Sequence, residues 1–250
     1  MRRDRAARGG VEPFLLERTF ADCLDRIALV QRSFARSLLI GCPDPSWPAR
    51  LRDLSAEVDV ADPGPLFAQA CGGQAILEDA WQPPASRYDL VVAIGTLDTV
   101  NGLPLALRIL FEAMSGEALL IGGISGGETL PNLRNAMRAA DGAMGAASAH
   151  VHPRIEAAAL APLLSAAGFA MPVVDVDRVE VRYPSLDRLV NDLRAMGATN
   201  ILAQRSREPL SRSAWRAARH AFDQAGTDGR TAETFEILHF AAWKHAAQEG

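Results

Sequence analysis

The sequence is poor in lysine and carries little net charge. Lys244 is the only lysine among 250 residues, so arginine supplies nearly all of the positive charge. The many arginines and alanines are typical of a GC-rich genome, and we assign the arginines no guanidinium-specific role on this ground. The net charge of −4 argues against a general nucleic-acid-binding surface.

Cysteine is scarce, and long apolar segments are missing. The cysteines, Cys23, Cys42 and Cys71, lie far apart and show neither metal-ligand spacing nor a disulfide framework. This usage suits a reducing cytoplasm. No apolar run is long enough to span a bilayer. The basic start, MRRDRAARGG, has no apolar segment behind it and does not resemble a secretory signal. We therefore expect a cytoplasmic protein with a solvated N-terminal arm, no membrane span and no metal site.

What is present is an alternation of helical and extended patterns. The composition, 48% hydrophobic and 22% charged, is that of a globular protein with a sizeable core. Apolar residues at helical spacing, bounded by glycine or proline residues that end a helix, predict helices at 12–36, 47–54, 65–71, 103–114, 130–144, 155–167, 186–196 and 210–224. Extended apolar patterns predict strands at 37–41, 56–60, 75–77, 88–95, 117–124, 173–183 and 234–243.

This alternation indicates an α/β fold with a doubly wound, mainly parallel sheet. The last strand is expected to be antiparallel. We expect a single domain over residues 1–250. Within it, 1–36 forms an N-terminal helical segment, and 125–165 and 184–228 form helical cap insertions.

A doubly wound sheet binds its ligand beyond the carboxyl ends of its strands. The second predicted strand ends near Asp59 and Asp62, Asp79 follows the third, and the segment 95–98 follows the fourth. A carboxylate after the second strand can accept hydrogen bonds from ribose hydroxyls, and one after the third can accept from an adenine amino group. Asp59 and Asp79 are also ordinary polar strand-end residues, and their spacing alone favours neither interpretation.

The loop after the first strand lacks the glycines that such a site normally has. Residues 37–48 read SLLIGCPDPSWP, with Pro43 and Pro45 where glycines would let the backbone approach a ligand. Proline has no N–H and a fixed φ, so the loop loses two potential backbone donors.

Several longer segments carry a family resemblance. They are DRAAR at 4–8, YDLVVAIGTLDTVNGLPLAL at 88–107, ISGGETLPNLRNAM at 124–137, HVHPRIEAAALAPLLSAAGF at 150–169, VDVDRVEVRYPSLDRLVNDLRAMGATN at 174–200 and FAAWKH at 240–245. Together they resemble class I S-adenosylmethionine-dependent methyltransferases. The resemblance is strongest to the group of the biotin-synthesis malonyl-carrier-protein methyltransferase and mitochondrial complex I assembly factor 5, and within it to the assembly-factor branch.

The resemblance implies a seven-stranded Rossmann-like sheet, a bacterial cytoplasmic protein and S-adenosylmethionine as cofactor. It places Asp59 on the ribose and Asp79, with Ala80 beside it, near the adenine. The pocket would also be lined by Gly41, Cys42, Ile94, Gly95 and Thr96. The chain departs from the family pattern, an acidic residue followed by Gly-Cys-Gly-x-Gly, at Leu39, Pro43 and Pro45.

Residues that could act on a substrate are few. Methyl transfer depends mainly on alignment of donor and acceptor, and a general base is optional. The resemblance places His150 and His152 in a loop over the site. We consider His152, Tyr183 and Asn200 as substrate contacts, against solvation, packing and turn formation as their ordinary roles.

Two functions follow. The first is an S-adenosylmethionine-dependent methyltransferase acting on a small acid or a protein side chain. The second is a degenerate relative that binds a partner protein during assembly of a respiratory complex without methyl transfer. A basic stretch near one predicted helix is by default a solvated face, and its sharper alternative is docking of an acidic partner: Arg205, Arg207, Arg212, Arg216 and Arg219. The assembly-factor branch also raises arginine hydroxylation, for which the sequence shows no convincing metal triad.

Overall fold

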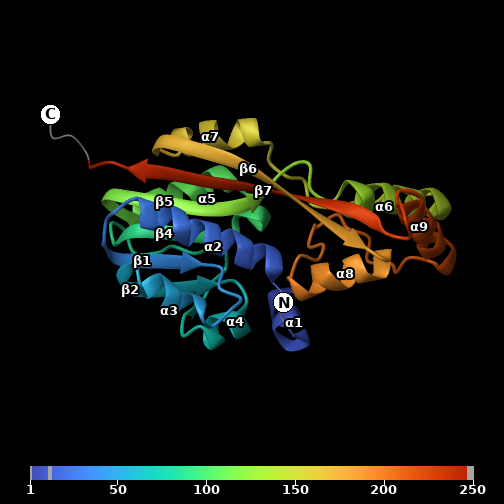
Figure 1. Ribbon diagram of the computed structural model, residues 1–250, viewed down its shortest axis with the longest axis horizontal. Coiled ribbons are helices and arrows are strands. Elements are labelled where there is room, and N and C mark those ends of the chain that lie inside the picture. The colour runs from blue at the N-terminus through green and yellow to red at the C-terminus, as the bar shows by residue number, and fades with distance from the viewer. Residues whose placement is uncertain (1, 11–12, 247–250) are drawn as a thin grey trace.

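The computed structural model describes residues 2–10 and 13–246. Its centre is a seven-stranded sheet in the order β3-β2-β1-β4-β5-β7-β6 (Figure 1). The strands are β1 (Phe34–Ile40), β2 (Ser55–Asp62), β3 (Gln74–Ala75), β4 (Tyr88–Ile94), β5 (Met114–Ser125), β6 (Ala170–Tyr183) and β7 (Thr231–Lys244). The first five strands run parallel to one another, and β7 runs antiparallel to both β5 and β6. The predicted Rossmann-like methyltransferase fold is confirmed.

The helices are α1 (Arg2–Gly9), α2 (Phe14–Leu29), α3 (Trp47–Arg52), α4 (Pro65–Ala70), α5 (Leu103–Ala113), α6 (Pro131–Met144), α7 (Ala157–Ala166), α8 (Leu186–Ala195) and α9 (Arg212–Gln224). A short 3-10 helix, η1 (Leu97–Thr99), follows β4. In the described part of the chain, no helix is long and apolar enough to cross a membrane.

Helices cover both faces of the central strands. Along β4, Val91 and Ala93 face a core that includes residues of α5 and α7, whereas Leu90, Val92 and Ile94 face a core built with α2 and α3. A strand buried on both faces must be apolar at every position, which explains the uninterrupted run LVVAI.

The strands β6 and β7 extend beyond the rest of the sheet as a two-stranded ribbon (Figure 1). The pairing of β7 with β5 begins at Ile237, whereas its pairing with β6 continues to Thr231. The helices α6, α8 and α9 pack on this extension and share one apolar core with it. The ribbon thus carries a helical cap beside the carboxyl end of the sheet.

The largest differences from the sequence predictions lie at the N-terminus. Residues 2–9 form helix α1, with Arg3 and Ala6 buried, so the expected solvated arm is wrong for these residues. The helix predicted over 12–36 ends at Leu29, and β1 starts at Phe34. Position 12 itself lies outside the described residues. The formation of α1 and the early start of β1 both depend on tertiary packing, because the buried faces of these elements contact elements far along the chain.

Candidate functional site

The loop after β1 is shaped by close contact with β4. Gly41 has a φ of +84°, and a Cβ added there would lie 2.0 Å from the carbonyl oxygen of Ile94 and 2.7 Å from Cγ2 of Thr96. Only glycine fits both the conformation and the space. Packing of the sheet therefore explains why Gly41 is present, independently of any ligand.

The backbone donors of this loop are largely used inside the protein. The N–H of Gly41 donates to Ala61 O, that of Cys42 to the Asp62 carboxylate, that of Ser46 to Asp44 Oδ1 and that of Trp47 to Asp44 O. Pro43 and Pro45 have no N–H. Because most backbone N–H groups of this loop already have partners within the protein, the loop offers few hydrogen-bond donors to the methionine end of a cofactor.

Asp62, at the end of β2, is fully buried, and its acceptor positions are filled. Its Oδ1 accepts the Gly64 N–H at 2.6 Å and Arg3 Nε at 2.8 Å. Its Oδ2 accepts the Cys42 N–H at 2.8 Å and Arg3 Nη2 at 2.5 Å. A carboxylate has about four lone-pair positions. Asp62 therefore has none left for ribose hydroxyls while Arg3 remains in place.

Arg3 is held on several sides. Its side chain is 4% exposed, its Nη1 donates to the Gly95 carbonyl oxygen at 3.4 Å, and its guanidinium lies 5.2 Å from the centre of the Phe67 ring. The first helix thus inserts a cation into the place where nucleotide-binding sheets of this topology hold a ribose.

Asp59 lies elsewhere. The second strand, which we expected to end near Asp59 and Asp62, ends at Asp62, so Asp59 lies inside it. The Asp59 carboxylate accepts hydrogen bonds from Arg36, Arg87 and the Tyr88 hydroxyl. Burial opposes ionisation of Asp59, but the hydrogen bonds from Arg36 and Tyr88 outweigh it and lower its pKa. Asp59 therefore belongs to an ion-pair cluster within the sheet, and Asp62 holds the strand-end position.

Two acidic residues follow β3, and one of them is half-buried whereas the other is exposed. Asp79 and Ala80 are exposed, and the Asp79 side chain accepts hydrogen bonds from the backbone and side-chain nitrogens of Asn101. Glu78 is half-buried, accepts from the Thr99 hydroxyl at 3.2 Å and faces Arg2. Burial raises the pKa of Glu78, and the charge of Arg2 opposes this shift.

The segment after β4 meets the first loop as expected. Ile94 is fully buried in the core, Gly95 has a φ of +58°, and Thr96 is buried with a hydroxyl that has no hydrogen-bond partner. Gly41, Cys42, Gly95 and Thr96 are thus brought together around the Arg3–Asp62 pair. Asp59 and Asp79 are not part of this cluster.

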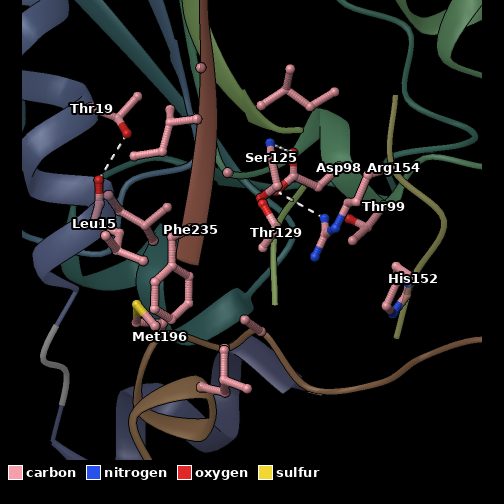
Figure 2. A pocket seen from close by; sticks show the side chains of 18 of the residues that line it. Leu15, Thr19, Asp98, Thr99, Ser125, Thr129, His152, Arg154, Met196 and Phe235 are labelled. Atoms are coloured by element: carbon pink, nitrogen blue, oxygen red, sulfur yellow. Dashed lines mark hydrogen bonds and ion pairs between the residues drawn. The ribbon is translucent and has the colours of Figure 1, made fainter. Parts of the chain in front are cut away.

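A cavity lies beside this cluster, between the carboxyl ends of β4 and β5, the helices α1, α2 and α8, and the β7 extension. Figure 2 shows an apolar wall with Leu15, Met196 and Phe235 and, opposite, a polar wall with Asp98, Ser125 and Arg154. The cavity encloses about 90 Å³, whereas pockets for drug-sized ligands start at roughly 300 Å³. It has room for a small group, but not for a nucleoside cofactor as well.

Arg154 is the most unusual group in the cavity wall. Its side chain is 10% exposed, and its Nε and Nη1 have no hydrogen-bond partner. Asp98 lies 3.5 Å from Nη1, but its carboxylate is already held by the backbone N–H and hydroxyl of Ser125, both at 2.9 Å. Buried guanidinium nitrogens without partners are expensive. They point to a ligand that carries acceptor oxygens.

The three predicted substrate residues have different surroundings. His152 lines the cavity, and its Nε2 accepts the Ile201 N–H at 3.1 Å. Burial, followed by the charge of Arg154, lowers the pKa of His152. Asn200 donates to Ala149 O and accepts from the Leu202 N–H, so it orders a cap loop. Tyr183 is buried in the apolar core of the cap, away from the cavity.

Sequence reasoning missed Arg2, Arg3 and Arg154, and it placed Asp62 near the end of the second strand without assigning it to the site. Asp62 stands three positions after Asp59, and a longer second strand would have selected it. Arg154 follows His152 in the motif HVHPR. Nothing in the sequence of α1 indicates that Arg3 reaches across to β2. Among the described residues, no cluster of three or more histidine, cysteine or acidic side chains could hold a metal ion.

Comparisons with known proteins agree with the fold. No protein-family profile matches the chain. The chain is 33% identical over 185 residues to a malonyl-[acyl-carrier protein] O-methyltransferase of Laribacter hongkongensis, covering 73% of this chain and 60% of that protein. It is 33% identical over 162 residues to the mitochondrial arginine-hydroxylase NDUFAF5 of Danio rerio, covering 64% of this chain and 50% of that protein. The chain thus spans only half to three fifths of these relatives.

Solved structures of low identity share the architecture. The YcgJ protein of Bacillus subtilis is 10% identical with a TM-score of 0.58, covering 86% of this chain and 94% of that one. A Haemonchus contortus phosphoethanolamine N-methyltransferase, solved with S-adenosylhomocysteine, is 11% identical with a TM-score of 0.50, covering 86% of this chain and 50% of that one. At such identities these similarities establish the fold alone.

Proposed function

The chain is a class I S-adenosylmethionine-dependent methyltransferase-like protein, and we propose that it transfers a methyl group from this cofactor to an anionic acceptor. The cofactor would lie in the cleft formed by Gly41, Cys42, Asp62, Gly95 and Thr96. The acceptor would enter the neighbouring cavity, and its anionic group would contact Arg154.

The guanidinium of Arg154, whose Nε and Nη1 make no hydrogen bond, carries this proposal. An acceptor carboxylate would supply the hydrogen-bond acceptors that Nε and Nη1 lack, beside the ion pair with Asp98. The printed name of the Laribacter relative specifies a malonyl group, whose free carboxylate has this chemistry. We therefore favour a small acid or an acyl group that ends in a carboxylate.

The chemistry needs little from the protein besides alignment. A carboxylate oxygen is already a nucleophile, so O-methylation of an acid requires no general base. His152 fits this requirement, because its lowered pKa keeps it neutral at pH 7. With Nε2 accepting from Ile201, its proton resides on Nδ1, where it can donate to an acceptor rather than remove a proton.

The cofactor requires a second arrangement of α1. When bound, S-adenosylmethionine supplies the electrophilic methyl group. Its ribose would use Asp62, whose acceptor positions Arg3 fills in the present arrangement. Release of Arg3 would free two of these positions and widen the space beside Gly95. In this proposal, the arrangement in which Arg3 binds Asp62 is the closed state of the cofactor site.

The alternative function is a degenerate relative that binds a partner protein, such as a respiratory-complex subunit, without methyl transfer. The filled acceptor positions of Asp62 and the prolines of the first loop favour it. The exposed arginines at and before α9, from Arg205 to Arg219, would then offer a surface for an acidic partner. A cytoplasmic location in a bacterium, expected from cysteine usage and composition, is likewise part of our proposal.

Titration calorimetry with S-adenosylhomocysteine separates the two functions. Micromolar binding supports methyl transfer, and no binding at millimolar ligand supports the alternative. The acceptor is tested separately by thermal shift with malonate, in the presence and absence of S-adenosylhomocysteine. Malonate should stabilise the wild type but not Arg154→Met. Arg138→Met, which removes an exposed arginine of α6, is the matched control. Equal stabilisation of all three proteins would overturn the role of Arg154.

A further inference from the structure

Two cysteines lie together at the edge of the cleft. Cys42 is buried in the loop after β1, and Cys71 is half-buried at the C-terminus of α4. The Cys71 Sγ donates to the Cys42 carbonyl oxygen at 3.1 Å, and the Cys42 Sγ donates to the Asp44 carbonyl oxygen at 3.3 Å. The two side chains also influence each other's ionisation. Neither is paired in a disulfide.

The surroundings make the two thiols unequal. The interaction with Cys42 lowers the pKa of Cys71, whereas the same interaction, followed by burial, raises the pKa of Cys42. A reactive cysteine needs both thiolate character and access. Cys71 has both. Cys23 has neither, because it is buried and burial raises its pKa to about 12.

We propose that Cys42 and Cys71 form a reversible disulfide when the protein meets a peroxide. The Cys71 thiolate attacks one peroxide oxygen, so an S–O bond forms, the O–O bond breaks and hydroxide leaves. Sulfur is oxidised to a sulfenic acid, and hydrogen peroxide is reduced. The Cys42 sulfur then attacks the Cys71 sulfur. The S–S bond forms, the S–O bond breaks, and the thiol proton leaves with the hydroxide as water.

The disulfide would link the loop after β1 to helix α4, and the loop and the residue before α4 both place a backbone N–H on the Asp62 carboxylate. The Cys42 N–H donates to Asp62 Oδ2, and Gly64, which precedes α4, donates to Oδ1. A disulfide between Cys42 and Cys71 ties the first loop to the far end of the same short helix. Oxidation would therefore fix the shape of the cofactor cleft, whether or not the protein transfers methyl groups.

Mass spectrometry of the full-length protein tests the proposal without any activity assay. The reduced protein is freed of reductant, treated with one equivalent of hydrogen peroxide and then alkylated with N-ethylmaleimide in denaturant, so that the buried Cys23 is accessible. We expect only one of three thiols to react with the maleimide, and a further loss of about 2 Da. Dithiothreitol should reverse the loss. A tryptic digest without reduction should contain residues 37–50 linked to residues 53–87.

Single-cysteine variants distinguish the disulfide from general oxidation. Cys23→Ser should still give the linked peptide. Cys71→Ser should give no linkage, and Cys42→Ser should leave Cys71 to gain oxygen atoms instead. The proposal fails if wild-type Cys71 gains oxygen while Cys42 remains alkylated, or if Cys23 is found in the linked peptide. The wild-type peptide map decides the question even if a variant does not fold.

Discussion

The guanidinium of Arg3 and the carboxylate of Asp62 form a buried, two-point ion pair that joins the first helix to the end of the second strand. The residues are 59 positions apart in the sequence. The pair places a cation where a nucleotide-binding sheet of this topology holds a ribose. In the function proposed above, this contact closes the cofactor site, and a bound nucleoside would have to compete with it.

The first prediction separates the two aspartates of β2. Asp62→Asn should weaken S-adenosylhomocysteine binding at least about tenfold, because an amide offers one acceptor oxygen in place of two. Asp59→Asn is the matched control and should leave the dissociation constant unchanged, since Asp59 faces Arg36 and Arg87. Calorimetry of both variants measures the difference. Loss of binding on Asp59→Asn with none on Asp62→Asn would reverse our assignment.

The same substitution also has a stability consequence. Asp62→Asn leaves the guanidinium of Arg3 buried without a charged partner, and breaking a buried pair from one side costs about 3–5 kcal/mol. Denaturant unfolding should show a loss of this size for Asp62→Asn. For Asp59→Asn the loss should be smaller, because its ion pairs are partly exposed and solvent screens them.

The sequence was sufficient for the architecture but not for the site. The apolar run LVVAI in β4 and the alternating pattern of β6 reflect local burial, so the sheet and its antiparallel last strand were predictable. The length of β2 was not, because Asp62 continues the strand through its pairing with Ala75 of β3. The place of Arg3 depends on α1 packing against α4 and α8. No local pattern encodes that contact.

Another prediction concerns the backbone at Gly41. Gly41→Ala should destabilise the protein by well over about 2 kcal/mol, because a Cβ would meet the Ile94 carbonyl oxygen at 2.0 Å in addition to the strain of a positive φ. Gly72→Ala isolates the strain alone, since Gly72 has a φ of +67° and no atom within 4 Å of an added Cβ. That variant should lose only about 1–2 kcal/mol. Equal losses in urea unfolding would contradict the packing argument.

A pH-dependent prediction rests on His239. This residue is 4% exposed, and burial lowers its pKa, although Asp22, 2.8 Å from Nδ1, opposes the shift. The unfolded chain, with a pKa near 6.5, therefore binds a proton at a higher pH than the folded protein does. The stabilisation from neutral His239 is fully present above about pH 6.5 and is lost as the pH falls through the folded pKa.

His239→Gln should therefore lose less stability than the wild type when the pH falls from about 7.5 to 5. Urea midpoints across this range provide the measurement. His220→Gln, on the exposed side of α9, should follow the wild-type profile. Parallel profiles for His239→Gln and the wild type would show that burial of His239 does not control the acid sensitivity.

The most direct test of the closed cleft is the affinity of S-adenosylhomocysteine for Arg3→Gln, measured by calorimetry beside the wild type and Arg5→Gln. Arg5 is an exposed arginine of the same helix and serves as the control. If Arg3 closes the ribose site, Arg3→Gln should bind at least about tenfold more tightly than the wild type, because the ligand no longer has to displace two charge-assisted hydrogen bonds. Arg5→Gln should match the wild type. Equal or weaker binding by a folded Arg3→Gln protein would contradict the account.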